Sequence, residues 1–182
     1  MSILVAYASR HGATGEIAGR IAENLREAGQ DAVALPVQDV DDVSDYEGFV
    51  LGSATYLGHW LKDATAFVKG NQDLLARRPV WLFSSGPLGT QLTDIKGVDL
   101  RAAASPAELR DLWEATHPRE HHVFFGVLDP GRLGFTERSM RLLPAARAML
   151  PAGDFRSWDE IQDWAYGIAK EMAQLDTTAA PG

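Results

Sequence analysis

The chain has 182 residues, of which 46% are hydrophobic and 23% are charged. This balance fits one soluble globular domain and excludes a disordered, collagen-like or coiled-coil protein. The absence of cysteine excludes disulfides and cysteine nucleophiles, and the net charge of −8 argues against nucleic acid as a partner. There is no signal peptide and no run of about 20 apolar residues, so we expect a cytoplasmic protein.

Five short apolar runs predict β-strands. Four of them are nearly continuous, which is typical of strands that helices cover on both faces. The weaker run, over residues 32–37, is expected at the edge of the sheet. The four stronger runs span residues 3–8, 49–51, 80–83 and 123–127.

Segments of helical periodicity lie between these runs. One carries an apolar stripe from Ile17 to Leu25 and ends near Gly29, and another covers residues 61–70. The remaining two helices have clearer start signals.

Both later helices begin with a serine that is followed three residues on by a glutamate, the pattern of a capping box. In one, Ser105 is the expected cap, Glu108 completes the box, and residues 117–118 end the helix. In the other, Ser157 is the expected cap and Glu160 follows.

The alternation of strands and helices predicts an α/β fold, a three-layer doubly wound sheet of five parallel strands in the order 2-1-3-4-5. Ligands bind at the carboxyl ends of the strands in such sheets. We therefore expect the site just after residues 8, 51, 83 and 127. Residues 1–176 are expected to form a single domain and residues 177–182 a disordered tail.

The loop after the first strand is typical of an anion site at the start of a helix. Small and hydroxyl residues let backbone N–H groups curl around an anion at the positive helix end. Ser9 and Thr14 can add hydroxyl donors, although a plain strand-to-helix turn is an alternative interpretation. The residues expected to bind the anion are Ser9, Arg10, His11, Gly12, Ala13 and Thr14.

Other phosphate-binding motifs are absent. The chain has no Gly-Lys pair for a Walker loop and no G-x-G-x-x-G spacing. A phospho-receiver domain would carry acidic residues after the first strand and an aspartate after the third. This chain has Ser9-Arg10 and Gly52-Ser53 at those places, which excludes a receiver domain.

Loops rich in glycine and serine also follow the third and fourth strands. Their backbone can approach the edge of a flat aromatic ligand while nearby rings cover its faces, with Trp60 the favoured ring and Tyr56 the second. Alternatively, both rings cap the core. The expected ligand-binding residues are Ala54, Thr55, Tyr56, Leu57, Gly58 and Trp60 in one loop and Ser84, Ser85, Gly86, Pro87, Leu88 and Gly89 in the other.

Residues 9–14 resemble the FMN-phosphate fingerprint of flavodoxins, Ser/Thr-x-Thr-Gly-x-Thr, except at His11, where most flavodoxins have threonine or serine. The resemblance implies a flavodoxin-like fold. It also implies bound FMN, with its phosphate on residues 9–14 and its ring between the loops that start at Thr55 and Ser84.

Within this superfamily, the chain is most similar to the menaquinone-dependent protoporphyrinogen dehydrogenases. Their phosphate loop, Thr-Arg-Asp-Gly-x-Thr, retains the arginine found here as Arg10. The Gly58-His59 pair before an aromatic residue and the long segment 129–155 are also similar. The resemblance implies an FMN-dependent oxidoreductase that passes electrons from a reduced substrate, such as a tetrapyrrole, to a quinone.

Two alternatives to this enzyme stay open. One is a non-catalytic electron-transfer flavodoxin, and the other is a related domain that uses a deazaflavin. The physiological electron acceptor and a homodimeric state are also left open by the sequence.

The histidines receive different interpretations. His59 falls in the presumed flavin loop, where it could hydrogen-bond the ring or a substrate, and it is the candidate catalytic residue. His121 and His122 are adjacent in a strand, so they point to opposite faces and cannot chelate one metal together. We interpret them as exposed strand-end residues and expect no metal site.

Residues 132–156 are basic in an otherwise acidic chain. Helical spacing predicts a short helix over residues 136–150, kinked at Pro144. Its arginines form either an ordinary solvated face or a patch for an anionic substrate or for peripheral contact with the inner membrane face. The patch residues are Arg132, Arg138, Arg141 and Arg147.

Overall fold

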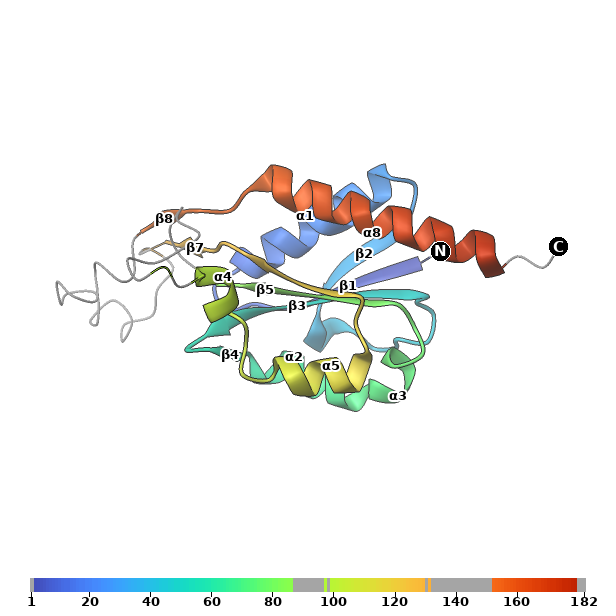
Figure 1. Cartoon of the computed structure of the whole chain (residues 1–182), viewed down its shortest axis with the longest axis horizontal. Helices are drawn as coiled ribbons and strands as arrows, with labels where there is room; N and C mark the ends of the chain where they lie inside the picture. The colour runs from blue at the N-terminus through green and yellow to red at the C-terminus, as the bar shows by residue number, and fades with distance from the viewer. Residues whose placement is uncertain (1, 87–96, 98, 130, 132–151, 180–182) are drawn as a thin grey trace.

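The computed structural model describes residues 2–86, 97, 99–129, 131 and 152–179. A parallel sheet lies between two layers of helices (Figure 1). Its strands are β1 (Ser2–Ala8), β2 (Asp31–Pro36), β3 (Gly48–Tyr56), β5 (Val80–Ser85) and β6 (Glu120–Phe124). They pair in the order β2-β1-β3-β5-β6, all parallel. Counted along the chain, this is the predicted order 2-1-3-4-5.

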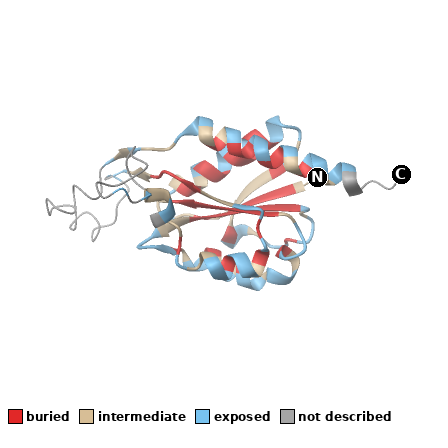
Figure 2. Ribbon diagram, in the orientation of Figure 1, coloured by how far each residue is buried: buried red, intermediate tan, exposed pale blue. Residues whose placement is uncertain are grey.

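Each face of the sheet packs on its own set of helices. Helices α1 (Ala13–Glu27) and α8 (Trp158–Ala179) cover one face, and α2 (Lys62–Gly70), α3 (Gln72–Leu75) and α5 (Leu109–Thr116) cover the other (Figure 1). Alternate residues of β1 pack on opposite faces of the sheet. Ile3 and Val5 belong to the core cluster under α1 and α8, and Leu4 and Ala6 belong to the cluster under α2, α3 and α5. The buried residues accordingly lie along the strands and on the inward faces of the helices (Figure 2).

The register aligns the carboxyl ends of the strands. Ala8 pairs with Ser53, Ser53 with Ser84, and Ser84 with Val123. The loops after β1, β3 and β5 therefore start side by side at one edge of the sheet. The short helix α4 (Leu100–Ala103) lies at the same edge (Figure 1).

The third strand is longer than predicted. It continues through the small polar residues to Tyr56 and turns back into β4 (His59–Trp60), which pairs antiparallel with it. The 3-10 turn η1 (Val37–Asp39) follows β2.

The predicted strand over residues 123–127 is wrong at its end. β6 stops at Phe124, and the chain leaves the sheet through Gly126, where an added Cβ would lie only 3.5 Å from the backbone nitrogen of Gly86. Two further short strands, β7 (Val127–Leu128) and β8 (Gly153–Asp154), then pair antiparallel.

The helix boundaries also differ in part. The N–H of Glu160 donates to Ser157 Oγ at 3.3 Å, as the capping box predicts. Ser105 does not begin α5, which starts at Leu109, because the Glu108 carboxylate contacts the β3–β4 hairpin instead. Helix α8 continues to Ala179, so the first three residues of the expected tail are helical.

Gly52 gives a test of the packing between the sheet and α8. A Cβ at this position would overlap the ring of Phe83, which packs edge-on against Trp164 of α8. We expect Gly52→Ala to lower the free energy of unfolding by about 1–3 kcal/mol, the usual cost of overpacking a core.

Gly19 provides the matched control, because an added Cβ there meets nothing within 4 Å and lies in α1. Gly19→Ala should leave stability unchanged or raise it by up to about 1 kcal/mol. Urea unfolding measures both variants, and equal stability of the two would contradict the packing described for Gly52.

Candidate functional site

The loop between β1 and α1 forms a tight turn at the start of a helix. Gly12 adopts a left-handed conformation with φ of 89°, and its N–H donates to Ser9 Oγ at 3.0 Å. Helix α1 begins at the next residue, so its first-turn N–H groups, which have no acceptor within the helix, lie at the carboxyl edge of the sheet. This arrangement places the positive end of the helix dipole at the predicted anion site.

The hairpin between β3 and β4 carries exposed apolar groups beside this loop. Leu57 and Gly58 form its turn with φ of 52° and 80°, and both positive values are typical of a two-residue hairpin turn. Leucine is unusual in this conformation. The side chain of Leu57 is 84% exposed, and Tyr56 is 39% exposed.

Side-chain contacts join the three strand-end loops. The guanidinium of Arg10 lies over the ring of Tyr56, 4.7 Å from its centroid. The hydroxyl of Thr14 shares a 2.8 Å hydrogen bond with that of Ser85 in the buried interior. The predicted residues of all three loops are therefore brought together, but the hydroxyls of Thr14 and Ser85 bond to each other.

Trp60 lies in the core and not at the surface. It is 3% exposed, and its indole N–H donates to Ser84 Oγ at 2.8 Å. The expectation that Trp60 covers a ligand ring is therefore wrong, and Tyr56 is the exposed aromatic residue of this hairpin. Ser84 is fully buried and also contacts His121 Nε2 at 2.9 Å.

His121 is half-buried and shares a hydrogen bond with the Ser84 hydroxyl through Nε2. Burial, together with the charge of neighbouring His122, lowers the pKa of His121 to about 4, against an opposing effect of Glu120. The interpretation of His121 as an exposed strand-end residue is wrong.

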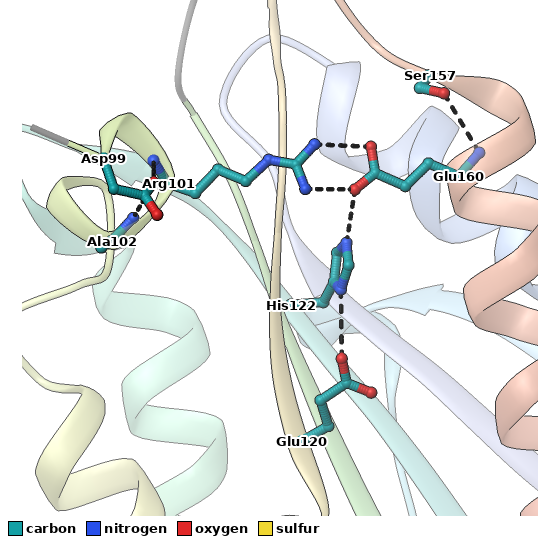
Figure 3. Close-up of polar contacts among 7 residues, drawn as sticks. All are labelled: Asp99, Arg101, Ala102, Glu120, His122, Ser157 and Glu160. Carbon is teal, nitrogen blue, oxygen red and sulfur yellow. Dashed lines mark hydrogen bonds and ion pairs between the residues drawn. The ribbon is translucent and has the colours of Figure 1, made fainter. Parts of the chain in front are cut away.

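His122 points to the opposite face of β6, as predicted, and bonds Glu160 of α8, which also pairs with Arg101 of α4 (Figure 3). The Arg101 guanidinium bonds both carboxylate oxygens of Glu160, at 2.7 and 2.9 Å. His122 Nε2 lies 2.9 Å from Glu160 and Nδ1 lies 3.3 Å from Glu120, whose other oxygen accepts the indole N–H of Trp164. Most polar atoms of these groups pair with one another, although the buried Nε of Arg101 has no hydrogen-bond partner among the described residues. We assign the cluster a structural role.

Glycines and one unpaired hydroxyl lie between the ends of β3 and β5. A Cβ at Gly86 would lie 3.3 Å from that of Thr55, tighter than ordinary packing. The hydroxyl of Thr55 is buried and has no hydrogen-bond partner among the residues that the structure describes. This part of the edge offers bare backbone and a polar group that needs a partner.

His59 is exposed on the hairpin, and its Nδ1 lies 2.7 Å from a carboxylate oxygen of Glu108. Sequence reasoning missed this pair because it interpreted Glu108 as part of a capping box. The two residues are 49 positions apart, and no periodicity or motif links them.

Some predicted residues lie outside the described ranges. These are Pro87, Leu88 and Gly89 of the fourth-strand loop and the patch residues Arg132, Arg138, Arg141 and Arg147. Arg156, the last arginine of the basic segment, is described. Its side chain is 7% exposed and pairs with Glu16 at 2.7 Å and Asp154 at 2.6 Å, so it is no open docking group.

The structure is a doubly wound α/β domain in which three strand-end loops meet at the carboxyl edge of the sheet. Residues 4–144 match the profile of the flavodoxin domain, and the chain belongs to that family. Flavin binding and electron transfer are the properties of this domain. No curated protein gives a significant sequence match.

Solved structures support the fold. A flavodoxin from the domain Archaea is 15% identical, with a TM-score of 0.58 over 94% of this chain and 98% of that one. Flavodoxin 2 from Bacillus cereus is 20% identical, with a TM-score of 0.56 over 96% and 99%. The Flv1 flavodiiron core from Synechocystis sp. PCC6803 is 13% identical, with a TM-score of 0.61 over 96% of this chain and 36% of that one.

Within the described ranges, every helix is too short or too polar to cross a bilayer.

The pKa of His121 predicts a pH dependence of stability. Because the folded-state pKa is depressed from 6.5 to about 4, the unfolded chain binds this proton more readily. The contribution to stability is complete above pH 6.5 and is lost as the pH falls toward 4, with a loss on the order of 2 kcal/mol by pH 5.

Urea unfolding at pH 7.5 and pH 5 checks this dependence. His121→Gln should remove that part of the pH dependence, whereas His117→Asn, at an exposed histidine, should retain it. An identical pH dependence in parent and His121→Gln would contradict the assignment.

Proposed function

We propose that the protein binds FMN at the carboxyl edge of the sheet and passes electrons from a reduced substrate to a quinone. The observation that carries the proposal is the convergence of three loops, joined by the Arg10–Tyr56 and Thr14–Ser85 contacts. Together these loops offer a helix N terminus for a phosphate and an exposed aromatic ring beside it.

The first loop fits the phosphate of FMN. Ser9 Oγ already accepts the N–H of Gly12, which leaves its own O–H to donate to a phosphate oxygen. Arg10 adds a positive charge. The acidic Glu16 in the first turn of α1 is compensated by Arg156 at 2.7 Å, so the start of the helix remains suited to an anion.

The second and third loops fit the ring. Arg10 covers one face of Tyr56, and the phenol is exposed enough for its other face to stack on a flat ligand. Gly86 lets the backbone approach the ring edge, and the unpaired hydroxyl of Thr55 can hydrogen-bond a polar ring atom. Leu57 adds an apolar cover at the hairpin tip.

FMN supplies one- and two-electron chemistry when bound. The chain's part is to hold the phosphate with the α1 N terminus, to orient the ring against Tyr56, and to leave its outer edge open to a partner. The net charge of −8 disfavours additional negative charge on the bound cofactor. We infer the quinone and the tetrapyrrole from the resemblance of the phosphate loop and the Gly58-His59 pair to the protoporphyrinogen dehydrogenases.

Gly12 tests the cofactor site. A side chain at its positive φ is strained by about 1–2 kcal/mol and stands where the phosphate must approach the backbone. We expect Gly12→Ala to weaken FMN binding at least tenfold in isothermal titration calorimetry.

Gly29→Ala is the matched control, because Gly29 has almost the same φ, 87°, at the opposite end of α1. It should cost similar stability and leave the FMN affinity unchanged. Equal affinities of the two variants would place the phosphate elsewhere.

The reaction itself is tested on the purified protein. We expect a flavin absorption spectrum, FMN as the mass of the released cofactor, and steady-state turnover with protoporphyrinogen and a soluble menaquinone analogue. Bound FMN without turnover would identify a non-catalytic electron carrier instead, and a released deazaflavin would contradict the proposed cofactor.

A further inference from the structure

His59 and Glu108 form a hydrogen-bonded pair at the open side of the proposed ring site. His59 Nδ1 lies 2.7 Å from Glu108 Oε1, and the other carboxylate oxygen accepts the backbone N–H of Trp60 at 3.3 Å. The imidazole is 61% exposed and the carboxylate 30%. One nitrogen of the ring is therefore fixed by the protein, while the other edge of the ring is open to a ligand.

The backbone holds this pair in a defined position. The carbonyl of Gly58 accepts the N–H of Ala107 at 2.8 Å, which ties the segment before α5 to the hairpin turn. Glu108 is itself the residue before α5, and its carbonyl accepts the N–H of Leu112. The carboxylate thus stands on a fixed helix start, and a histidine that it holds cannot move freely with the hairpin tip.

The surroundings of Glu108 favour the ionised form of its carboxyl group. Burial acts to raise the pKa of Glu108, but hydrogen bonds from His59 and from backbone N–H groups, with the charge of His59, outweigh it and hold this pKa below its usual value. An ionised carboxylate only accepts, so Nδ1 of His59 carries the proton of the short bond. Tyr56, which is paired with His59 across the hairpin and has Arg10 over its ring, is a further titratable group on this hairpin.

We propose that His59 donates a proton to the electron acceptor and that Glu108 is its positioning residue. The proposal rests on the proposed function, since it places the acceptor beside the outer edge of the bound cofactor. A carboxylate behind Nδ1 fixes the ring orientation and stabilises the imidazolium, which leaves Nε2–H as the outward donor.

The reaction balances with one proton from this histidine. Each quinone carbonyl becomes a hydroxyl, so the acceptor takes up two electrons and two protons. A bound reduced cofactor would supply both electrons and one proton as a hydride and would release its remaining proton to solvent, while Nε2 of His59 would supply the second proton to the acceptor. The neutral imidazole then regains a proton from solvent through its exposed edge.

The test compares two oxidants of the FMN-loaded, reduced protein in stopped-flow experiments. A soluble menaquinone analogue needs protons, whereas ferricyanide takes electrons without them. With the quinone we expect His59→Gln to slow oxidation about 100-fold and Glu108→Gln about tenfold, as for the loss of a general acid and of its positioning group. The rate with ferricyanide should be unchanged in both variants.

The control is Glu114→Gln, which removes an exposed carboxylate of α5 that pairs with exposed Arg110. It should retain the parent rates with both oxidants.

A second readout needs no cofactor. Carbon-13 NMR of the apo protein should show a higher pKa of the Glu108 carboxyl in His59→Gln, because a hydrogen bond and a charge that lower it are gone. A parent protein that binds no FMN would overturn the proposed function. A parent that binds FMN but has the same quinone rates as both variants would overturn this inference alone, as would an equal loss with ferricyanide.

Discussion

The hydroxyl groups of three serines, buried at the ends of β3 and β5, are the points at which the site loops are attached to the sheet. Ser53 Oγ accepts the backbone N–H of Leu61, just after the β3–β4 hairpin. Ser84 Oγ accepts the indole N–H of Trp60. The Ser85 hydroxyl shares a hydrogen bond with that of Thr14 in the first turn of α1. All three are at most 5% exposed. A buried hydroxyl must be paired, so each serine constrains the loop that supplies its partner. These buried hydrogen bonds hold the β3–β4 hairpin in place and so position its exposed side chains, Tyr56 and His59.

The sequence allowed the fold to be predicted well where burial alone decides the structure. The apolar runs of β1 and β5 and the stripe of α1 face the core whatever their partners are. Prediction failed where a distant contact decides the outcome. Residues 52–55 are small, yet they extend β3 because β1 and β5 pair with its residues 52–54 and β4 pairs with its end. The residues after Phe124 look like a strand, but the chain turns away where Gly126 meets Gly86.

For the site, too, features that depend on the local sequence could be predicted and features that depend on distant contacts could not. The location of the loops, and of the turn that precedes α1, could be predicted because the carboxyl ends of parallel strands meet at one edge. Which aromatic ring is exposed could not be predicted, because the burial of Trp60 depends on distant contacts, namely its packing in the core beside α2 and its hydrogen bond to Ser84. The pairing of His59 with Glu108 was equally hidden, since it depends on how the start of α5 meets the hairpin. A polar residue at a strand end can therefore either hold a loop in place or face a ligand. Its burial in the folded chain shows which of the two roles it has.

The position of FMN on the protein tests the account most directly. Titration of FMN into nitrogen-15-labelled protein, followed by amide NMR, should shift most strongly the signals of residues 10–15, 55–58 and 86, with small changes in α3 and at the amino ends of the strands. That result would place the cofactor across the three joined loops. Shifts centred on α2 and α3, or on the amino edge of the sheet, would contradict the site.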